Sequence, residues 1–124
     1  MAANTFNIVN LPFEGSEFFV SFASEEITDA LTLVAAVSGK SHHITRINVR
    51  TDAAMDINIG SGVVANAITT THIGPVPLAA GFGFFGWRSP EGKAMKLTSG
   101  AALGLDSTAD GTIWVEVWGR TCKD

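Results

Sequence analysis

The feature that most constrains the fold is a period-two alternation of apolar and polar residues in short stretches. One stretch lies between residues 42 and 51. There Thr45, Ile47 and Val49 alternate with the more polar residues Arg46, Asn48 and Arg50. Because successive side chains of a strand point to opposite faces, this pattern predicts a strand with one buried and one solvated face. Similar alternation recurs over residues 16–23 and 55–60.

The composition favours the same class of structure. Val, Ile, Thr, Phe and Trp supply 42 of the 124 residues, and 13 glycines are spread along the chain. Many short strands joined by Gly-rich turns are typical of a sandwich or a barrel. With about eight or nine strands, the sequence predicts an all-β antiparallel β-sandwich, one domain over residues 14–124, preceded by an N-terminal extended segment over residues 1–13.

Several local signals are more specific. Residues 25–37 fit two patterns, because their apolar positions match a helix as well as an alternating strand; the β-branched residues favour the strand. Ser38–Ser41 predicts a turn. Pro75 and Pro77 lack the backbone N–H groups that would donate hydrogen bonds to a neighbouring strand, which predicts an edge strand or an extended connection. Asp110-Gly111 predicts a hairpin turn.

Charge and cysteine content exclude several classes of function. The formal net charge is −4, from 8 Lys and Arg against 12 Asp and Glu. A nucleic-acid-binding domain needs a basic stripe, so no nucleic-acid partner is predicted. No apolar run approaches the roughly 18 residues of a membrane-spanning helix, so no membrane partner is predicted. A single cysteine, Cys122, excludes an intrachain disulfide and a multi-cysteine zinc site.

One stretch matches a nucleotide-binding motif by spacing alone. Residues 81–86 read G-x-G-x-x-G. That motif binds a dinucleotide only when a helix N-terminus follows to hold the pyrophosphate. Pro90 and Gly92 come within six residues of Gly86 and break any such helix. The stretch is better explained as a glycine-kinked β segment that exposes aromatic side chains, and no cofactor is predicted.

No catalytic or metal-binding constellation is apparent. His42 and His43 are adjacent, so on one strand they point to opposite faces and cannot chelate one ion; with His72 they are expected to be polar surface histidines. The segment from Asp106 to Asp110 begins like a calcium loop but has Val117 where an EF-hand needs glutamate. Cys122 lies near the chain end, where fraying is expected, with no histidine near it in sequence. The sequence therefore predicts a protein that is not an enzyme and holds no metal.

The aromatic residues are the unusual feature. Trp114 and Trp118 fall opposite Ile113, Val115 and Val117, so this strand is apolar on both sides. Either it is a central strand between two layers, or the tryptophans cover a contact between subunits. A second cluster is too large for one turn to bury, which is typical of a contact surface. It consists of Phe82, Phe84, Phe85 and Trp87.

The N-terminal segment also presents alternatives. Residues 2–13 carry too many apolar side chains for a free solvated tail, among them Phe6, Ile8 and Phe13, and Pro12 keeps the segment from forming a central strand. We expect it to reach a neighbouring subunit or partner. An ordinary edge strand of the same subunit is the equally weighted alternative.

An ordered series of segments resembles small β-sandwich structural proteins of tailed bacteriophages. The series begins with a hairpin from residues 31–40 into residues 44–50, and continues with the short strand 55–59 and its Ser-Gly. It goes on through residues 73–80, a Gly-rich stretch and residues 92–98, and ends in the strand after Asp110-Gly111. It covers about three-quarters of the chain, over residues 31–121, and departs from the pattern at residues 81–86.

The resemblance implies a jelly-roll-like sandwich that assembles as a homotrimer on a virion. It implies a capsid decoration (cement) protein, made in the host cytoplasm, that binds the major capsid protein at the phage head surface and stabilises the shell. A carbohydrate-binding or host-adhesion module of a tail or head fibre is the alternative, with Trp87, Arg88 and Glu91 as its nearest candidate cluster. The candidate subunit or capsid interface comprises Phe6, Ile8, Phe13, Phe82, Phe84, Phe85, Trp87, Trp114 and Trp118.

Overall fold

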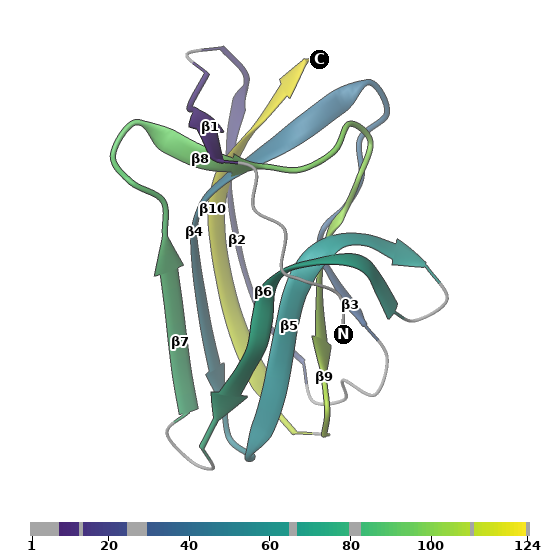
Figure 1. The fold of residues 1–124 in the computed structure, drawn as a ribbon, viewed down its shortest axis with the longest axis vertical. Coiled ribbons are helices and arrows are strands. Elements are labelled where there is room, and N and C mark those ends of the chain that lie inside the picture. The colour runs from purple at the N-terminus through teal and green to yellow at the C-terminus, as the bar shows by residue number, and fades with distance from the viewer. Residues whose placement is uncertain are drawn as a thin grey trace.

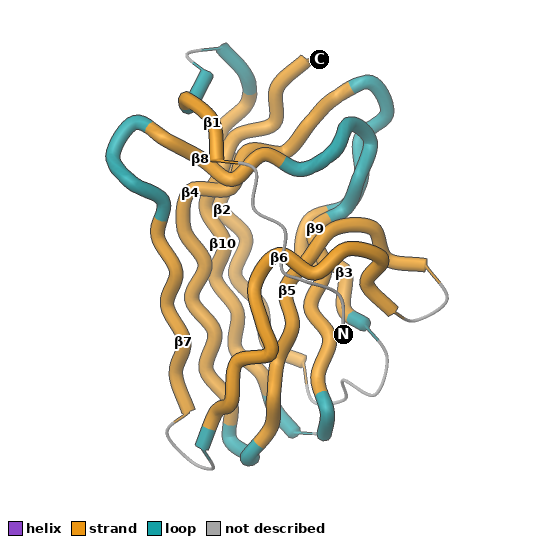
Figure 2. Tube along the Cα trace, in the orientation of Figure 1, coloured by secondary structure: helices purple, strands orange, loops and turns teal. Residues whose placement is uncertain are grey.

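The computed structural model describes residues 8–12, 14–24, 30–64, 67–79, 83–109 and 111–123. Within these ranges the chain forms ten strands and no helix (Figure 2), so no described helix is long and apolar enough to cross a membrane. The strands are β1 (Ile8–Asn10), β2 (Ser16–Ser24), β3 (Leu31–Val34), β4 (Lys40–Thr51), β5 (Met55–Val64), β6 (Ala67–Leu78), β7 (Gly83–Arg88), β8 (Lys93–Lys96), β9 (Leu103–Ser107) and β10 (Ile113–Lys123).

Eight of these strands make two four-stranded antiparallel sheets that lie against each other as two layers (Figure 1). The first sheet has the order β2-β10-β4-β7 and the second the order β3-β9-β5-β6. Between these eight strands, the chain crosses from one sheet to the other at every connection except that between β5 and β6, which pair as a hairpin. This strand order is that of a jelly roll, so the predicted all-β sandwich is confirmed.

The core lies between the two sheets and is built from the inward positions of both. Ile47, Val49, Val115 and Val117 of the first sheet have at most 1% of their surface exposed. Ile57, Ile59, Leu103 and Leu105 of the second sheet are fully buried opposite them. In β4, Ile47 and Val49 belong to the alternating set seen in the sequence, so the period-two pattern predicted their inward orientation, whereas Thr45, the third member of that set, is not among the buried residues.

A register shift in the first sheet adds one inward residue to β4. Gly119 pairs with Ile44 while the preceding Trp118 pairs with Arg46, so Thr45 has no partner on β10. Ile44 and Ile47 are both fully buried although they lie three residues apart, a spacing that strict alternation does not allow. The Thr45 hydroxyl donates to the Trp118 carbonyl oxygen at 3.2 Å, which ties the bulged residue to β10.

The short strands β1 and β8 extend the first sheet at the end of β4 that is remote from the β4–β5 turn (Figure 1). Ile8 pairs with Met95 and Asn10 pairs with Lys93 in antiparallel register. Residues 8–10 therefore form an edge strand of their own subunit, the alternative to a reaching arm, and the arm prediction is wrong for them. Residues 1–7 and 13 lie outside the described residues.

Four further predictions about strands and connections can be compared with the topology. The stretch over 31–34 is strand, as favoured over helix, while residues 25–29 are not described. The predicted hairpin from residues 31–40 into 44–50 is wrong, because β3 and β4 belong to different sheets. The hairpin expected at Asp110-Gly111 is wrong for the same reason, since β9 and β10 lie in opposite layers. β6, which carries Pro75 and Pro77, is an edge strand as predicted.

Candidate interaction face

The outward side chains of the first sheet form rows across four strands, because the register aligns them. Trp114 of β10 pairs with Arg50 of β4, and Arg50 pairs with Phe84 of β7. Four positions along, Trp118 pairs with Arg46, and Arg46 pairs with Arg88. The whole set is named the arginine–aromatic face here. It comprises Glu17, Phe19, Ser21 and Ala23 of β2; Arg46, Asn48 and Arg50 of β4; Phe84, Gly86 and Arg88 of β7; and Trp114, Glu116, Trp118 and Arg120 of β10.

Cation–π contacts organise this face. The Arg50 guanidinium carbon lies 4.5 Å from the centroid of the Trp114 ring, and that of Arg46 lies 4.9 Å from the Trp118 ring. The ring of Phe19 packs against Trp118, with centroids 4.8 Å apart. Each cation–π contact at an exposed site is worth about 0.5–1 kcal/mol, so the two arginines are held against the rings rather than free in solvent.

The large apolar side chains of the face are exposed. Phe84 exposes 62% of its surface, Phe19 54% and Trp114 38%. Scattered exposed apolar residues are ordinary, but exposed rings contributed by β2, β7 and β10 to one sheet surface form a patch. Trp, Phe and Arg are also the residue types that are enriched at protein interfaces.

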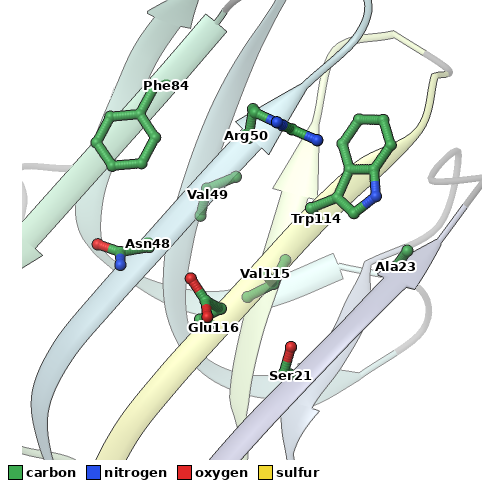
Figure 3. Close-up of a pocket in the computed structure, with 9 residues that line it drawn as sticks. All are labelled: Ser21, Ala23, Asn48, Val49, Arg50, Phe84, Trp114, Val115 and Glu116. Carbon is green, nitrogen blue, oxygen red and sulfur yellow. The ribbon is translucent and has the colours of Figure 1, made fainter.

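Residues of this face line three hollows: a small one of about 220 Å³ against Glu17, Trp118 and Arg120, and two that are larger. The larger of these two, of about 620 Å³, is lined by Arg50, Trp114 and Phe84 in one row and by Asn48, Glu116 and Ser21 in the next (Figure 3). The other, of about 360 Å³, lies further along the sheet, beside the turn between β7 and β8. Its charged and aromatic lining consists of Arg46, Arg88, Glu91, Lys93 and Trp118.

The charge on the face is unevenly paired. Arg120 forms an ion pair with Glu17 at 2.7 Å and donates to the Pro12 carbonyl oxygen. That is the one ion pair among the residues described, so Arg46, Arg50 and Arg88 have no described carboxylate within 4.0 Å. Within the described part of the chain, the three guanidinium groups therefore carry positive charge without an ion-pair partner, on a protein whose net charge is −4.

The structure separates the nine predicted interface residues. Phe84, Trp114 and Trp118 lie on the arginine–aromatic face. Phe85 and Trp87 point the other way and pack against the core, so they are not part of this surface. Ile8 is 41% exposed on β1, away from the face. The remaining three residues lie outside the described residues: Phe6, Phe13 and Phe82.

The sequence pattern does not reveal the polar half of the face. By alternation alone, Arg46 and Arg50 belong to the solvated side of a strand, and Phe19 lies on the face opposite Phe18 and Val20 with no contact role. The signal that links them is the shared outward phase of residues 46–50 and 114–118, but only the pairing of β4 with β10 brings the two sets together.

The candidate carbohydrate cluster is not assembled. Arg88 points outward from β7, whereas Trp87 packs against the core, so Trp87, Arg88 and Glu91 do not share a surface. An exposed tryptophan with amide and carboxylate neighbours exists elsewhere on the sheet. It is Trp114, which lines the larger hollow with Asn48 and Glu116.

The histidines are buried, which corrects their expected place on the surface. His42, His43 and His72 each expose 5% or less. His42 contacts the Thr121 hydroxyl at 2.9 Å and the Ala35 carbonyl oxygen at 2.7 Å, so it links β4, β10 and the β3–β4 connection. Among the described residues, no group of three or more His, Cys, Asp or Glu side chains could hold a metal ion.

Cys122 is also inside the fold rather than at a frayed end. β10 continues to Lys123, and Cys122 pairs with Ser41 of β4. Its thiol lies 3.2 Å from the Glu14 carbonyl oxygen. Burial raises the pKa of the Cys122 thiol, and the charge of Arg120 lowers it by less. A buried thiol with a raised pKa is a poor nucleophile, because the thiolate is the reactive form.

Comparison with known proteins adds little to this description. No family model matches the sequence, and no curated protein does. Among solved structures, the chain is similar to a dTDP-4-dehydrorhamnose 3,5-epimerase from Bacillus anthracis strain Ames, crystallised with TDP and PPi. The identity is 14% and the TM-score 0.35, over 94% of this chain and 55% of that one. The chain thus spans about half the length of the epimerase, and a likeness this distant says nothing of its activity.

Proposed function

We propose that this chain is a non-enzymatic virion structural protein, a capsid decoration protein that binds the phage head surface as a homotrimer. The observation that carries the proposal is the arginine–aromatic face, an exposed patch whose residue types are those of protein interfaces. The jelly-roll fold and the sequence resemblance to phage structural proteins support it. The phage origin and the trimer come from that resemblance.

Binding of many copies would stabilise the shell by mass action. A protein that binds the assembled lattice and not its dissociated subunits shifts the equilibrium toward the lattice. A trimer multiplies the effect, because the second and third contacts form at a high effective concentration once the first has formed. A face of modest affinity therefore suffices when three copies engage together.

Cosedimentation with phage heads that lack the protein tests the proposal. The unaltered chain is expected to sediment with the heads, whereas the double variant Phe84→Ala with Trp114→Ala is expected to stay in solution. Val37→Ala is the matched control, because Val37 is an exposed apolar residue, 39% exposed, that lies off the face. Light scattering should give three times the 13.0 kDa mass of one chain. Absence of sedimentation by the unaltered chain would refute the capsid role.

A carbohydrate-binding module is the second candidate, and one observation favours it. The larger hollow combines the Trp114 ring with the amide of Asn48, the carboxylate of Glu116 and the hydroxyl of Ser21. An aromatic platform ringed by a few polar groups is the usual construction of a small-ligand pocket. A glycan array separates the candidates: hits that Trp114→Ala removes would favour the module, and an array without hits would count against it.

A further inference from the structure

The charge of this protein is segregated between one sheet surface and the rest of the chain. All four arginines of the sequence lie on the arginine–aromatic face, together with Glu17 and Glu116, which gives 4 − 2 = +2 for the face. The remaining residues carry four lysines against ten acidic residues, or −6, and the two sums give the net charge of −4. The arginine–aromatic face therefore carries a net positive charge on an acidic protein.

Two arginines of this face are held directly opposite each other. Arg46 of β4 and Arg88 of β7 are register partners, so their Cβ atoms lie about 4.5–5.5 Å apart. Like charges directly opposite each other on a sheet destabilise it. Neither arginine has a described carboxylate within 4.0 Å, although Glu91 lines the same hollow. The juxtaposition of the two arginines therefore does not itself stabilise the fold of the isolated chain.

The pair is arranged to receive a carboxylate. The Arg46 guanidinium lies over the Trp118 ring, with its carbon 4.9 Å from the ring centroid, and no described group accepts a hydrogen bond from this side chain, so its N–H groups are available as donors. Lys93 lines the same hollow and donates to the Asn10 side-chain oxygen. With Glu91 included, the hollow carries three cations against one anion. A carboxylate entering between the two guanidinium groups would cancel their repulsion and accept a bidentate hydrogen bond.

We infer that the arginine–aromatic face docks onto an acidic protein surface whose carboxylate inserts between Arg46 and Arg88. This inference rests on the proposed function and names the chemistry of the partner on the phage head. Four aromatic rings spread over three strands suit an extended protein surface rather than one sugar ring, and those rings are Phe19, Phe84, Trp114 and Trp118. The same face of a second copy is a poor occupant, because it would bring arginines against arginines.

Removal of the pair tests the inference in the cosedimentation assay. Arg46→Gln with Arg88→Gln should weaken head binding by about 30-fold or more, the usual loss when one side of a desolvated charge pair is truncated. Lys40→Gln with Lys123→Gln is the matched control, since it removes two positive charges from exposed register partners off the face and should bind normally. Arg88→Lys keeps the charge but loses the guanidinium fork, so it should also bind more weakly.

The variant Arg88→Glu separates a binding role from a structural one. It places opposite charges across β4 and β7, so the chain should unfold at an equal or higher denaturant concentration while head binding is lost. If this variant unfolds more easily than the unaltered chain, the like-charge argument is wrong. Added salt should weaken head binding by the unaltered chain, because salt screens the attraction between the two arginines and the carboxylate of the partner. The double glutamine variant lacks this attraction, so its binding should depend less on salt.

Other outcomes would overturn the inference in distinguishable ways. The double alanine variant, Phe84→Ala with Trp114→Ala, could lose head binding while the double glutamine variant keeps it. That result would support the proposed function and refute the inference that the partner surface is acidic. If light scattering shows that the double glutamine variant no longer forms a trimer, the group that binds between the two arginines belongs to a second copy of this chain. Binding of an alginate oligosaccharide that this variant abolishes would make an acidic saccharide the ligand.

Discussion

The orientation of the β7 aromatics can be tested by alanine substitution at two nearby positions. Trp87 packs against the core, whereas Phe84 points outward and is 62% exposed. Full burial of a Phe or Trp typically makes its truncation to alanine cost about 3–5 kcal/mol. Because Trp87 is only half-buried, we expect Trp87→Ala to lower the free energy of unfolding by about 2 kcal/mol. Phe84→Ala should lower it by less than about 1 kcal/mol, the span of strand propensity.

Urea unfolding followed by circular dichroism measures both changes. The free energy of unfolding of a domain this size falls by about 2 kcal/mol per molar urea. Trp87→Ala should therefore lower the midpoint by about 1 M urea, and Phe84→Ala should lower it by less than about 0.5 M. Phe85→Ala should resemble Trp87→Ala, because Phe85 also packs against the core. Equal losses at 84 and 87, or a larger loss at 84, would mean that β7 pairs with β4 one residue out of this register, since a one-residue slip exchanges the two faces.

Three further substitutions or treatments test other contacts. His42→Ala should cost about 1–3 kcal/mol in urea unfolding, since it removes two hydrogen bonds of a buried ring, to the Ala35 carbonyl oxygen and the Thr121 hydroxyl, each worth about 0.5–1.5 kcal/mol; an unchanged midpoint would contradict this role. Glu17→Gln should cost at most about 1 kcal/mol, and 1 M salt should abolish the difference, because the Glu17 side chain is 79% exposed. Cys122 should react with a thiol reagent far more slowly in the folded chain than in urea, and its rate should rise only at higher pH than that of free cysteine, because burial raises its pKa; equal rates would mean that the end of β10 opens.

The alternation within single stretches determined much of the fold class. In residues 46–50 the polar and apolar positions are distinct, so the inward orientation of Ile47 and Val49 follows from the order of residues along the strand. The sandwich class and the edge position of β6 also follow from local chemistry, since strand-forming residues, glycines and Pro75 act on their own segments.

Tertiary structure alone decided what residues of different strands do together. Residues 83–88 are almost uniformly apolar, so no alternation fixed their phase, and pairing with β4 turned Phe84 outward and Trp87 inward. The histidines look like surface residues by type, but neighbouring strands bury them. Arg46, Arg88 and Trp118 lie up to 72 positions apart in sequence, and they meet because β4 lies between β7 and β10. Sheet order depends on long-range packing of whole layers, which no local pattern records, and the candidate interaction face exists only through that order.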